Sequence, residues 1–280
     1  SSAAKALGKP TKILIDLQGP ELRIGDISGY RTLKTDGNVI FGQRGIPVPE
    51  ILLAQGKKGM RFLLDDGKME VEVLECNSSQ MLAKVLRGGV LKSRKSITPE
   101  ETVIETPTLT AKDLENLKIA GQYGVTGVML PFVRSDQDLL CLRQKLEENH
   151  SGHIKIFAKI ENMQGVEALD TFLPLADEIV IARGDLGNAV PLWELPAVQK
   201  QIGAQCRRAG KPFMVVTQML DSMEHSPVPT RAEVSDIYNA VLEGASSLML
   251  TGETAVGGYP AEAMRYLVKT AKSGLRHRIV

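Results

Sequence analysis

The sequence predicts an α/β protein built from repeated βα units, with a small antiparallel β domain inserted near its start. From about Asp113 onward, short continuous apolar runs alternate with amphipathic stretches at intervals of about 25 to 35 residues, the period of a βα unit. Between about Gly25 and Thr98, apolar residues alternate with polar ones instead, which is typical of antiparallel strands with one solvated face. Repeated βα units form either an open doubly wound sheet or a closed barrel.

The expected parallel strands are continuous apolar runs, as strands that are covered on both faces require. A first strand covers residues 12–17, and the later ones cover residues 125–130, 154–158, 178–182, 212–216 and 247–250. Helices are expected between them, for example at 135–148 and 195–209. Ser135 and Asp136 can cap the first of these helices, and Gly210 ends the second.

The inserted segment shows the period-two alternation of half-buried strands. Met69, Val71 and Val73 fall on one face of an expected strand, and residues 81, 83 and 85 fall on one face of the next. Turn residues separate the strands at 65–67, 77–79 and 88–89. We therefore expect residues 1–24 and 99–280 to form the main βα domain and residues 25–98 to form the inserted β domain.

Composition limits the possible functions. The chain has 280 residues, a formal net charge of +1 and 43% hydrophobic residues, as expected for a globular protein with a sizeable core. The small net charge argues against a nucleic-acid-binding or membrane surface, and no apolar run reaches the roughly 20 residues that span a bilayer. No signal peptide is visible and the three cysteines are far apart, so a reducing cytoplasm is the expected location.

Polar residues gather where the expected strands end. Four strands run directly into charged or hydroxyl residues, at 158–162, 182–187, 217–219 and 250–254, and the first strand ends in Asp16, ahead of residues 18–23. In a (β/α) barrel the carboxyl ends of the strands form one rim, where catalytic residues converge. A single acid there could be a helix cap, but five such strand ends favour an active site.

Two carboxylates at these strand ends are candidate ligands of a divalent metal. Lys159 and Glu161 are two residues apart, so both side chains point to one face of the strand; the alternative is a buried structural ion pair. Asp185 lies between glycines, which let the backbone approach a ligand closely; the alternative is a helix cap. Carboxylates completed by water and substrate oxygens suit Mg²⁺ or Mn²⁺.

Two further strand ends carry weaker signals. Thr217 is the last residue of its expected strand, where its hydroxyl would face the rim; a core position is the alternative. The turn at Gly252 and Glu253 resembles a helix start whose amides could hold an anion, and Glu253 could cap that helix or support its neighbours. The GxxxxGK[ST] loop and the protein-kinase motifs are absent from the sequence, which excludes those two classes of phosphotransferase.

Taken together, the motifs resemble the pyruvate kinase family. The resemblance rests on segments 155–162, 182–187, 210–212, 217–223, 229–233 and 250–260, and upstream on Asp16 and segments 19–23, 63–67 and 132–135. They follow the family's order over almost the whole chain. The resemblance implies a TIM-type (β/α)8 barrel with an inserted lid domain. It also implies Mg²⁺-dependent transfer of a phosphoryl group from phosphoenolpyruvate to ADP, the glycolytic step that gives pyruvate and ATP.

The resemblance further implies roles for individual residues. Glu161 and Asp185 would hold Mg²⁺ or Mn²⁺, and Lys159 would neutralise charge on the transferred phosphoryl group. Thr217 would lie near the substrate's carboxylate and the face that is protonated. Backbone amides around Gly184 and Asp185 would bind that carboxylate at a helix N-terminus.

Outside this group, the resemblance assigns supporting roles. Arg23 would be a further catalytic and phosphate-binding residue. Apart from the resemblance, Lys95 ends the basic run 92–95, which could reach a nucleotide phosphate from the inserted domain; a solvated face is the alternative. Asp16 and the backbone of Leu17 would help to bind K⁺. Two residues of the last strand end would support the site without touching substrate, namely Thr251 and Glu253. Residues 25–98 would form a mobile lid over the nucleotide, and we expect a homo-oligomer.

The sequence departs from the family in three ways. Nothing matches the Arg-x-Asn-x-Ser-His motif of the family's second strand, so we expect that the barrel's first two strands are missing from this chain. We likewise expect that the family's C-terminal domain is missing from this chain. Locally, Leu17 stands where threonine is usual, Thr251 replaces serine, and Pro131 would remove a hydrogen-bond donor from its strand.

Two other functions stay open at the level of sequence. A lyase or aldolase-type relative would stabilise a pyruvate enolate at the same metal site without a nucleotide, although the inserted lid domain argues against it. A non-catalytic relative would fit the missing arginine-bearing strand. Against it stands the joint retention of four candidate residues, Lys159, Glu161, Asp185 and Thr217.

Overall fold

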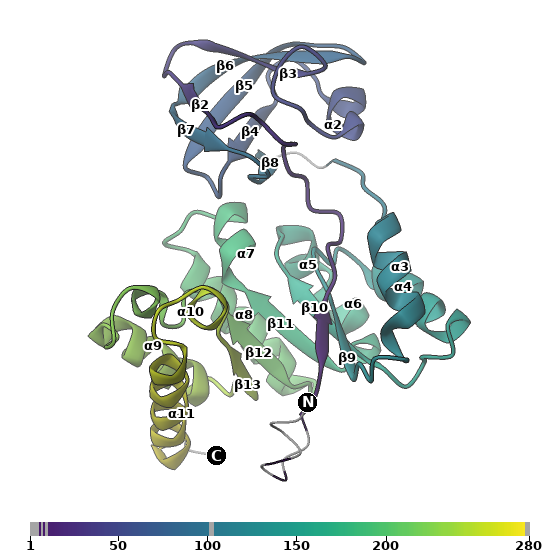
Figure 1. The fold of residues 1–280 in the computed structure, drawn as a ribbon. Coiled ribbons are helices and arrows are strands. Elements are labelled where there is room, and N and C mark those ends of the chain that lie inside the picture. Colours follow the sequence, from purple (N-terminus) through teal and green to yellow (C-terminus); the bar gives the residue numbers. More distant parts are fainter. Residues whose placement is uncertain (1–5, 7, 9–10, 101–103, 278–280) are drawn as a thin grey trace. The chain divides into compact units, whose positions relative to one another are not determined.

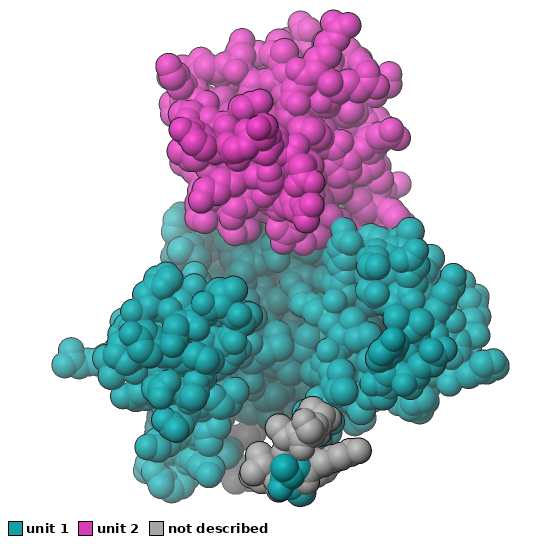
Figure 2. All heavy atoms as spheres, in the orientation of Figure 1, with its two compact units in different colours: residues 1–19, 108–280 teal, residues 20–107 magenta. Residues whose placement is uncertain are grey.

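The chain folds into two compact units. The computed structural model describes residues 6, 8, 11–100 and 104–277. Unit 1 comprises residues 1–19 and 108–280, and unit 2 comprises residues 20–107, as coloured in Figure 2. Unit 2 is therefore an insertion that follows the first strand of unit 1.

Unit 1 contains a curled six-stranded sheet in which every pairing is parallel (Figure 1). Its strands lie in chain order, namely β1 (Leu14–Asp16), β9 (Gly127–Leu130), β10 (Lys155–Ile160), β11 (Glu178–Ala182), β12 (Phe213–Val216) and β13 (Ser247–Met249). A doubly wound sheet reverses its strand order at a switch point. This order never reverses, as in the wall of a barrel, with β1 and β13 as the two edges in the described part of the chain.

Helices connect the successive strands of unit 1. In chain order they are α3 (Ala111–Ala120), α4 (Asp136–Glu148), α5 (Met163–Glu167), α6 (Leu169–Phe172), α7 (Arg183–Ala189), α8 (Leu195–Arg208), α9 (Arg231–Leu242), α10 (Gly252–Ala255) and α11 (Pro260–His277). Two 3₁₀ turns, η1 (Leu173–Leu175) and η2 (Asp221–Glu224), complete the set. Among the residues with described structure, no helix is both long and apolar enough to cross a membrane.

The four inner strands of the unit 1 sheet, β9 to β12, are buried on both faces, which explains their continuous apolar runs. Ile156, Ala158 and Ile160 of β10 belong to the main core, which also contains Leu139 and Leu142 of α4. Phe157 lies between them and points to the opposite face. There it joins a second cluster with Met129, Val180, Ala182, Met214 and Val216.

Unit 2 is an antiparallel β domain. Its five-stranded sheet has the order β3 (Asn38–Gly42), β6 (Gln80–Arg87), β5 (Met69–Cys76), β4 (Arg61–Leu64) and β8 (Ile97–Glu100), and β2 (Tyr30–Leu33) pairs with β7 (Gly89–Lys92). One short helix, α2 (Glu50–Gln55), follows β3. The alternating apolar residues of β5 and β6 are at most 1% exposed, so the predicted inserted β domain is confirmed. Its core also includes Ile24 and Ile104, which lie outside the expected range 25–98.

Some local expectations were wrong. β1 is three residues long, shorter than the expected strand at 12–17. Pro131 lies just after the last residue of β9, so its lack of an N–H does not remove a hydrogen bond from that strand. Ser135 occupies the N-cap position of α4 but makes no capping hydrogen bond with its side chain. Instead, the buried carboxylate of Asp138 accepts a hydrogen bond from the backbone N–H of Arg134 at 2.8 Å.

Asp138 also binds the segment at which the chain re-enters unit 1. Its carboxylate accepts hydrogen bonds from the guanidinium of Arg134 and from the hydroxyl of Thr108. Burial would raise the pKa of Asp138, but these hydrogen bonds outweigh it, and the pKa lies below its usual range. The ionised carboxylate therefore stabilises the fold.

We predict that Asp138→Asn lowers the free energy of unfolding by roughly 1 to 3 kcal/mol at pH 7, because partners of a buried charge are left unsatisfied. The ionised carboxylate stabilises the wild type fully above the unfolded-state pKa of about 3.9. This stabilisation is lost as the pH falls through the lower folded-state pKa. The difference in free energy of unfolding between the wild type and Asp138→Asn, measured by urea unfolding, should therefore be smaller at pH 3 than at pH 7. Asp136→Asn on the same helix is the control. The same difference at both pH values would contradict the prediction.

Candidate active site

The structure brings three of the expected strand-end residues together. The Lys159 ammonium lies 3.2 Å from Oε1 of Glu161 and 3.2 Å from both carboxylate oxygens of Asp16. Lys159 and Glu161 share a face because they are two residues apart at the end of β10. Asp16 ends β1, which is separated from β10 by β9. The ammonium therefore joins carboxylates from two strands that are not neighbours.

Lys159 is held as a cation. Its side chain is 13% exposed, and burial would lower its pKa. The charges of Glu161 and Asp16 and their hydrogen bonds outweigh burial, so the pKa of Lys159 is raised. The site thus presents a partly desolvated ammonium group at neutral pH, the form needed to neutralise an anionic ligand.

Glu161 is the most buried acid of the group, at 4% exposure. Its Oε2 accepts a hydrogen bond from the backbone N–H of Phe132 at 2.8 Å. Burial is the main cause that raises the pKa of Glu161 to about 7; Lys159 opposes it, and the charge of Asp185 adds to it. The two carboxylates thus repel each other, which a cation between them would relieve.

The donor set fits a hard divalent cation. Both Glu161 and Asp185 offer carboxylate oxygens, and each oxygen has a second lone pair in addition to any hydrogen bond that it accepts. In residues 6, 8, 11–100 and 104–277, no group of three or more His, Cys, Asp or Glu side chains is placed to hold a metal. A metal at these two acids would complete its shell with water or substrate oxygens, as Mg²⁺ prefers.

Thr217 follows the last residue of β12 and is held in a strained backbone conformation. Its φ of 79° is rare for a β-branched residue, and Gln218 follows with a φ of 53°. The carbonyl oxygen of Thr217 accepts hydrogen bonds from Nη2 and Nε of Arg183, at 2.7 and 3.2 Å. A Cβ added to Gly184 would lie 3.2 Å from Cγ2 of Thr217. Gly184 therefore permits the close contact between the start of α7 and Thr217.

Arg183 is in turn fixed by Asp236 of α9. Its Nη1 lies 2.7 and 2.9 Å from the two carboxylate oxygens of Asp236. Both side chains line a cavity of about 340 Å³ with residues of α8 and α9. The sequence pointed to the backbone around Arg183, not to its side chain or to Asp236.

Glu253 connects the ends of two neighbouring strands. It is 2% exposed, and its carboxylate accepts hydrogen bonds from the backbone N–H groups of Leu220, at 2.9 Å, and Thr251, at 2.7 Å. Leu220 lies in the loop after β12, and Thr251 lies just after β13. Glu253 thus supports both its own turn and the neighbouring one.

The remaining expected residues are placed as follows. In unit 1, the side chain of Leu17 is buried in the core and its N–H donates to the carbonyl of Met129, so only its backbone could contact a cation. In unit 2, Arg23 pairs with Glu21 at 2.6 Å and donates to the carbonyl of Arg94. Lys95 lies 2.7 Å from Asp65, also in unit 2.

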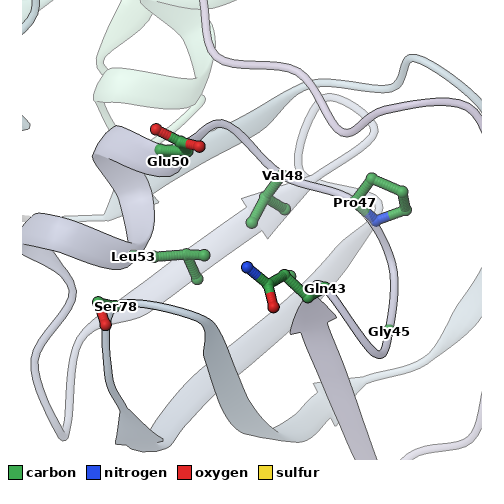
Figure 3. Close-up of a pocket in the computed structure, with 8 residues that line it drawn as sticks. Gln43, Gly45, Pro47, Val48, Glu50, Leu53 and Ser78 are labelled. Atoms are coloured by element: carbon green, nitrogen blue, oxygen red, sulfur yellow. The ribbon is translucent and has the colours of Figure 1, made fainter.

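A shallow cavity in unit 2 contains none of the expected site residues. It has a volume of about 280 Å³, and Figure 3 shows Gln43, Val48 and Leu53 around it. The complete lining is Gly42, Gln43, Gly45, Pro47, Val48, Glu50, Leu53 and Ser78. These residues carry no cationic group, so the cavity does not suit an anionic substrate.

Comparison with known proteins shows which family the chain is similar to. A family model described as pyruvate kinase, barrel domain, matches residues 1–264. Pyruvate kinases from Geobacillus stearothermophilus and Bacillus licheniformis are 37% and 38% identical to the chain, over 99% of it and 49% and 50% of their own lengths. That of Lachancea kluyveri is 39% identical over 94% of the chain and 55% of its own length. The chain spans about half the length of these relatives, and it belongs to the pyruvate kinase family.

Proposed function

We propose that the natural protein transfers the phosphoryl group of phosphoenolpyruvate to ADP, giving pyruvate and ATP. The observation that carries this proposal is the Lys159 ammonium, fixed between the carboxylates of Glu161 and Asp16 at the carboxyl ends of parallel strands. Phosphoryl transfer depends on positioning and on neutralising charge more than on covalent chemistry by the protein. A fixed, partly desolvated ammonium group supplies both.

The metal would be held by Glu161 and Asp185. Mg²⁺ or Mn²⁺, when bound there, would neutralise charge on the phosphoryl oxygens and on the enolate oxygen. Lys159 would contact the phosphoryl group from the side of Asp16. The K⁺ that the family uses would be bound by the carboxylate of Asp16 and the backbone of Leu17.

The substrate's carboxylate would lie at the start of α7, where the amides of Gly184 and Asp185 begin a helix. The contact between Gly184 and Thr217 would place the threonine hydroxyl beside the carbon that takes up the proton. Arg183 would be a positioning residue that fixes Thr217. Glu253, with Thr251, would keep the turn after Thr217 in place.

Unit 2 would act as the lid. Arg23 and Lys95 would contact nucleotide phosphates once ADP is bound, and closure would exclude water so that the phosphoryl group reaches ADP. The reaction would take place in the cytoplasm. Lyase chemistry without a nucleotide would leave these two cations of unit 2 unused, which favours the kinase.

We predict that the natural protein forms pyruvate from phosphoenolpyruvate and ADP only when Mg²⁺ is present. Lys159→Met should lower kcat by about 10²- to 10³-fold, the usual effect of losing one preorganised charge contact. Lys155→Met, on an exposed residue at the start of the same strand, is the control and should have little effect. No turnover by the natural protein would refute the proposal. Proton exchange of pyruvate without nucleotide, together with no binding of ADP, would favour the lyase alternative.

We also predict that Arg183→Lys lowers kcat about tenfold or more with little change in KM, because lysine keeps the charge but cannot donate two hydrogen bonds to Thr217. Asp236→Asn leaves those two hydrogen bonds in place, so its effect on kcat should be smaller. Steady-state kinetics give kcat and KM separately for both variants. An unchanged kcat in Arg183→Lys would exclude a positioning role.

A further inference from the structure

Asp113 accepts more hydrogen bonds than its place in a helix requires. It is fully buried in the first turn of α3. With Thr110 it forms a capping box, in which its carboxylate accepts from the N–H and the hydroxyl of Thr110 at 2.9 and 2.8 Å. That motif already satisfies two backbone N–H groups at the start of the helix, those of Thr110 and Asp113.

The same carboxylate also holds a segment that is distant along the chain. The backbone N–H groups of Gln18 and Gly19 donate to its two oxygens, at 2.8 and 3.0 Å. These two residues come after Leu17, which follows β1 directly, and Gly19 is the last residue of unit 1 before the chain enters unit 2. One buried carboxylate thus binds both the outgoing chain, at Gln18 and Gly19, and the returning chain, at Thr110.

The position of Gly19 is fixed by a second, steric constraint. Its φ is +59°, and a Cβ added to it would lie 2.3 Å from Cγ of Pro131. Any side chain at this position would therefore collide with the proline ring in addition to the strain of the left-handed backbone. The segment is held both by hydrogen bonds and by close packing.

The returning chain has a similar anchor one helix further along. Thr108, the first residue of unit 1 after the insertion, donates its hydroxyl to the buried carboxylate of Asp138 in the first turn of α4. Both connections between the units therefore end on a buried aspartate at the N-terminus of a helix of unit 1.

We propose that Asp113 is a positioning residue that clamps both peptide connections of the inserted unit to unit 1, with Asp138 as a second anchor on the returning chain. When unit 2 moves, the backbone then changes conformation only between Gly19 and Thr108. The end of β1 and the carboxylate of Asp16 stay in place beside Lys159. The consequence for catalysis rests on the proposed function, whereas the clamp itself does not.

Hydrogen exchange followed by NMR tests the clamp without any substrate. In the wild type, the amide hydrogens of Gln18 and Gly19 should exchange as slowly as those in the interior of α3, although they lie in a loop. Exchange at the rate of an unstructured loop would overturn the proposal, and this result needs no variant.

Asp113→Asn keeps the volume of the side chain but replaces one acceptor oxygen by a donor. It should speed exchange at Gln18 and Gly19 by tenfold or more relative to the amides of β10, which report on the global fold. Thr110→Ala is the matched control: it weakens the capping box and leaves the two distant hydrogen bonds, so Gln18 and Gly19 should stay protected. Equal protection in both variants would overturn the proposal.

Kinetics then separate the clamp from the proposed function. If the natural protein turns over, Asp113→Asn should lower kcat about tenfold, because the end of β1 is released, and Thr110→Ala should leave kcat near the wild-type value. A kcat that falls equally in both variants would show that Asp113 acts only through the helix cap. If the natural protein shows the expected exchange pattern but no turnover, the positioning role of Asp113 stands and the proposed kinase function is refuted.

Discussion

The structure of the site depends on one electrostatic arrangement, the Lys159 ammonium group held by Glu161 on its own strand and by Asp16 from β1. Burial makes the charges of Lys159 and Glu161 costly alone, and each is tolerated because the other is present, with the more exposed Asp16 as a second partner of Lys159. Glu161 still has a pKa raised to about 7, mainly by burial and also by Asp185. Glu161 and Asp185 therefore carry more negative charge than the Lys159 ammonium group offsets, and a divalent cation would supply the missing positive charge.

The fold provides this arrangement at the cost of backbone strain. Phe132 and Thr217 both have positive φ values, of 53° and 79°. Thr217 directly follows the end of β12, and Phe132 lies two residues after the end of β9, behind Pro131. Such conformations cost on the order of 1 to 3 kcal/mol each and persist only where the surroundings impose them. Here the Phe132 N–H donates to Glu161, and the Thr217 carbonyl accepts from Arg183. The strain therefore turns a backbone donor and a backbone acceptor toward the groups at the rim.

The sequence predicted those features that depend on local periodicity. The apolar run of β10 followed by Lys159 and Glu161 needs only the two-residue period of a strand, and the alternation in β5 needs only one solvated face. The choice between a doubly wound sheet and a barrel needed the strand order, which repeated βα units alone leave open. The contact of Lys159 with Asp16 spans 143 residues and that of Arg183 with Asp236 spans 53, so no local pattern contains them. The conformation of Thr217 contradicts its intrinsic preference, so propensity could not reveal it.

The most direct test of the central arrangement is a crystal structure of the protein with Mn²⁺ and oxalate, a planar dianion that imitates the enolate of pyruvate. Anomalous scattering locates the manganese ion without reference to the protein chemistry. The account predicts one strong peak bound by carboxylate oxygens of Glu161 and Asp185, with the Lys159 ammonium group beside the same site. A manganese ion bound elsewhere in unit 1, with these two acids uncoordinated, would contradict it.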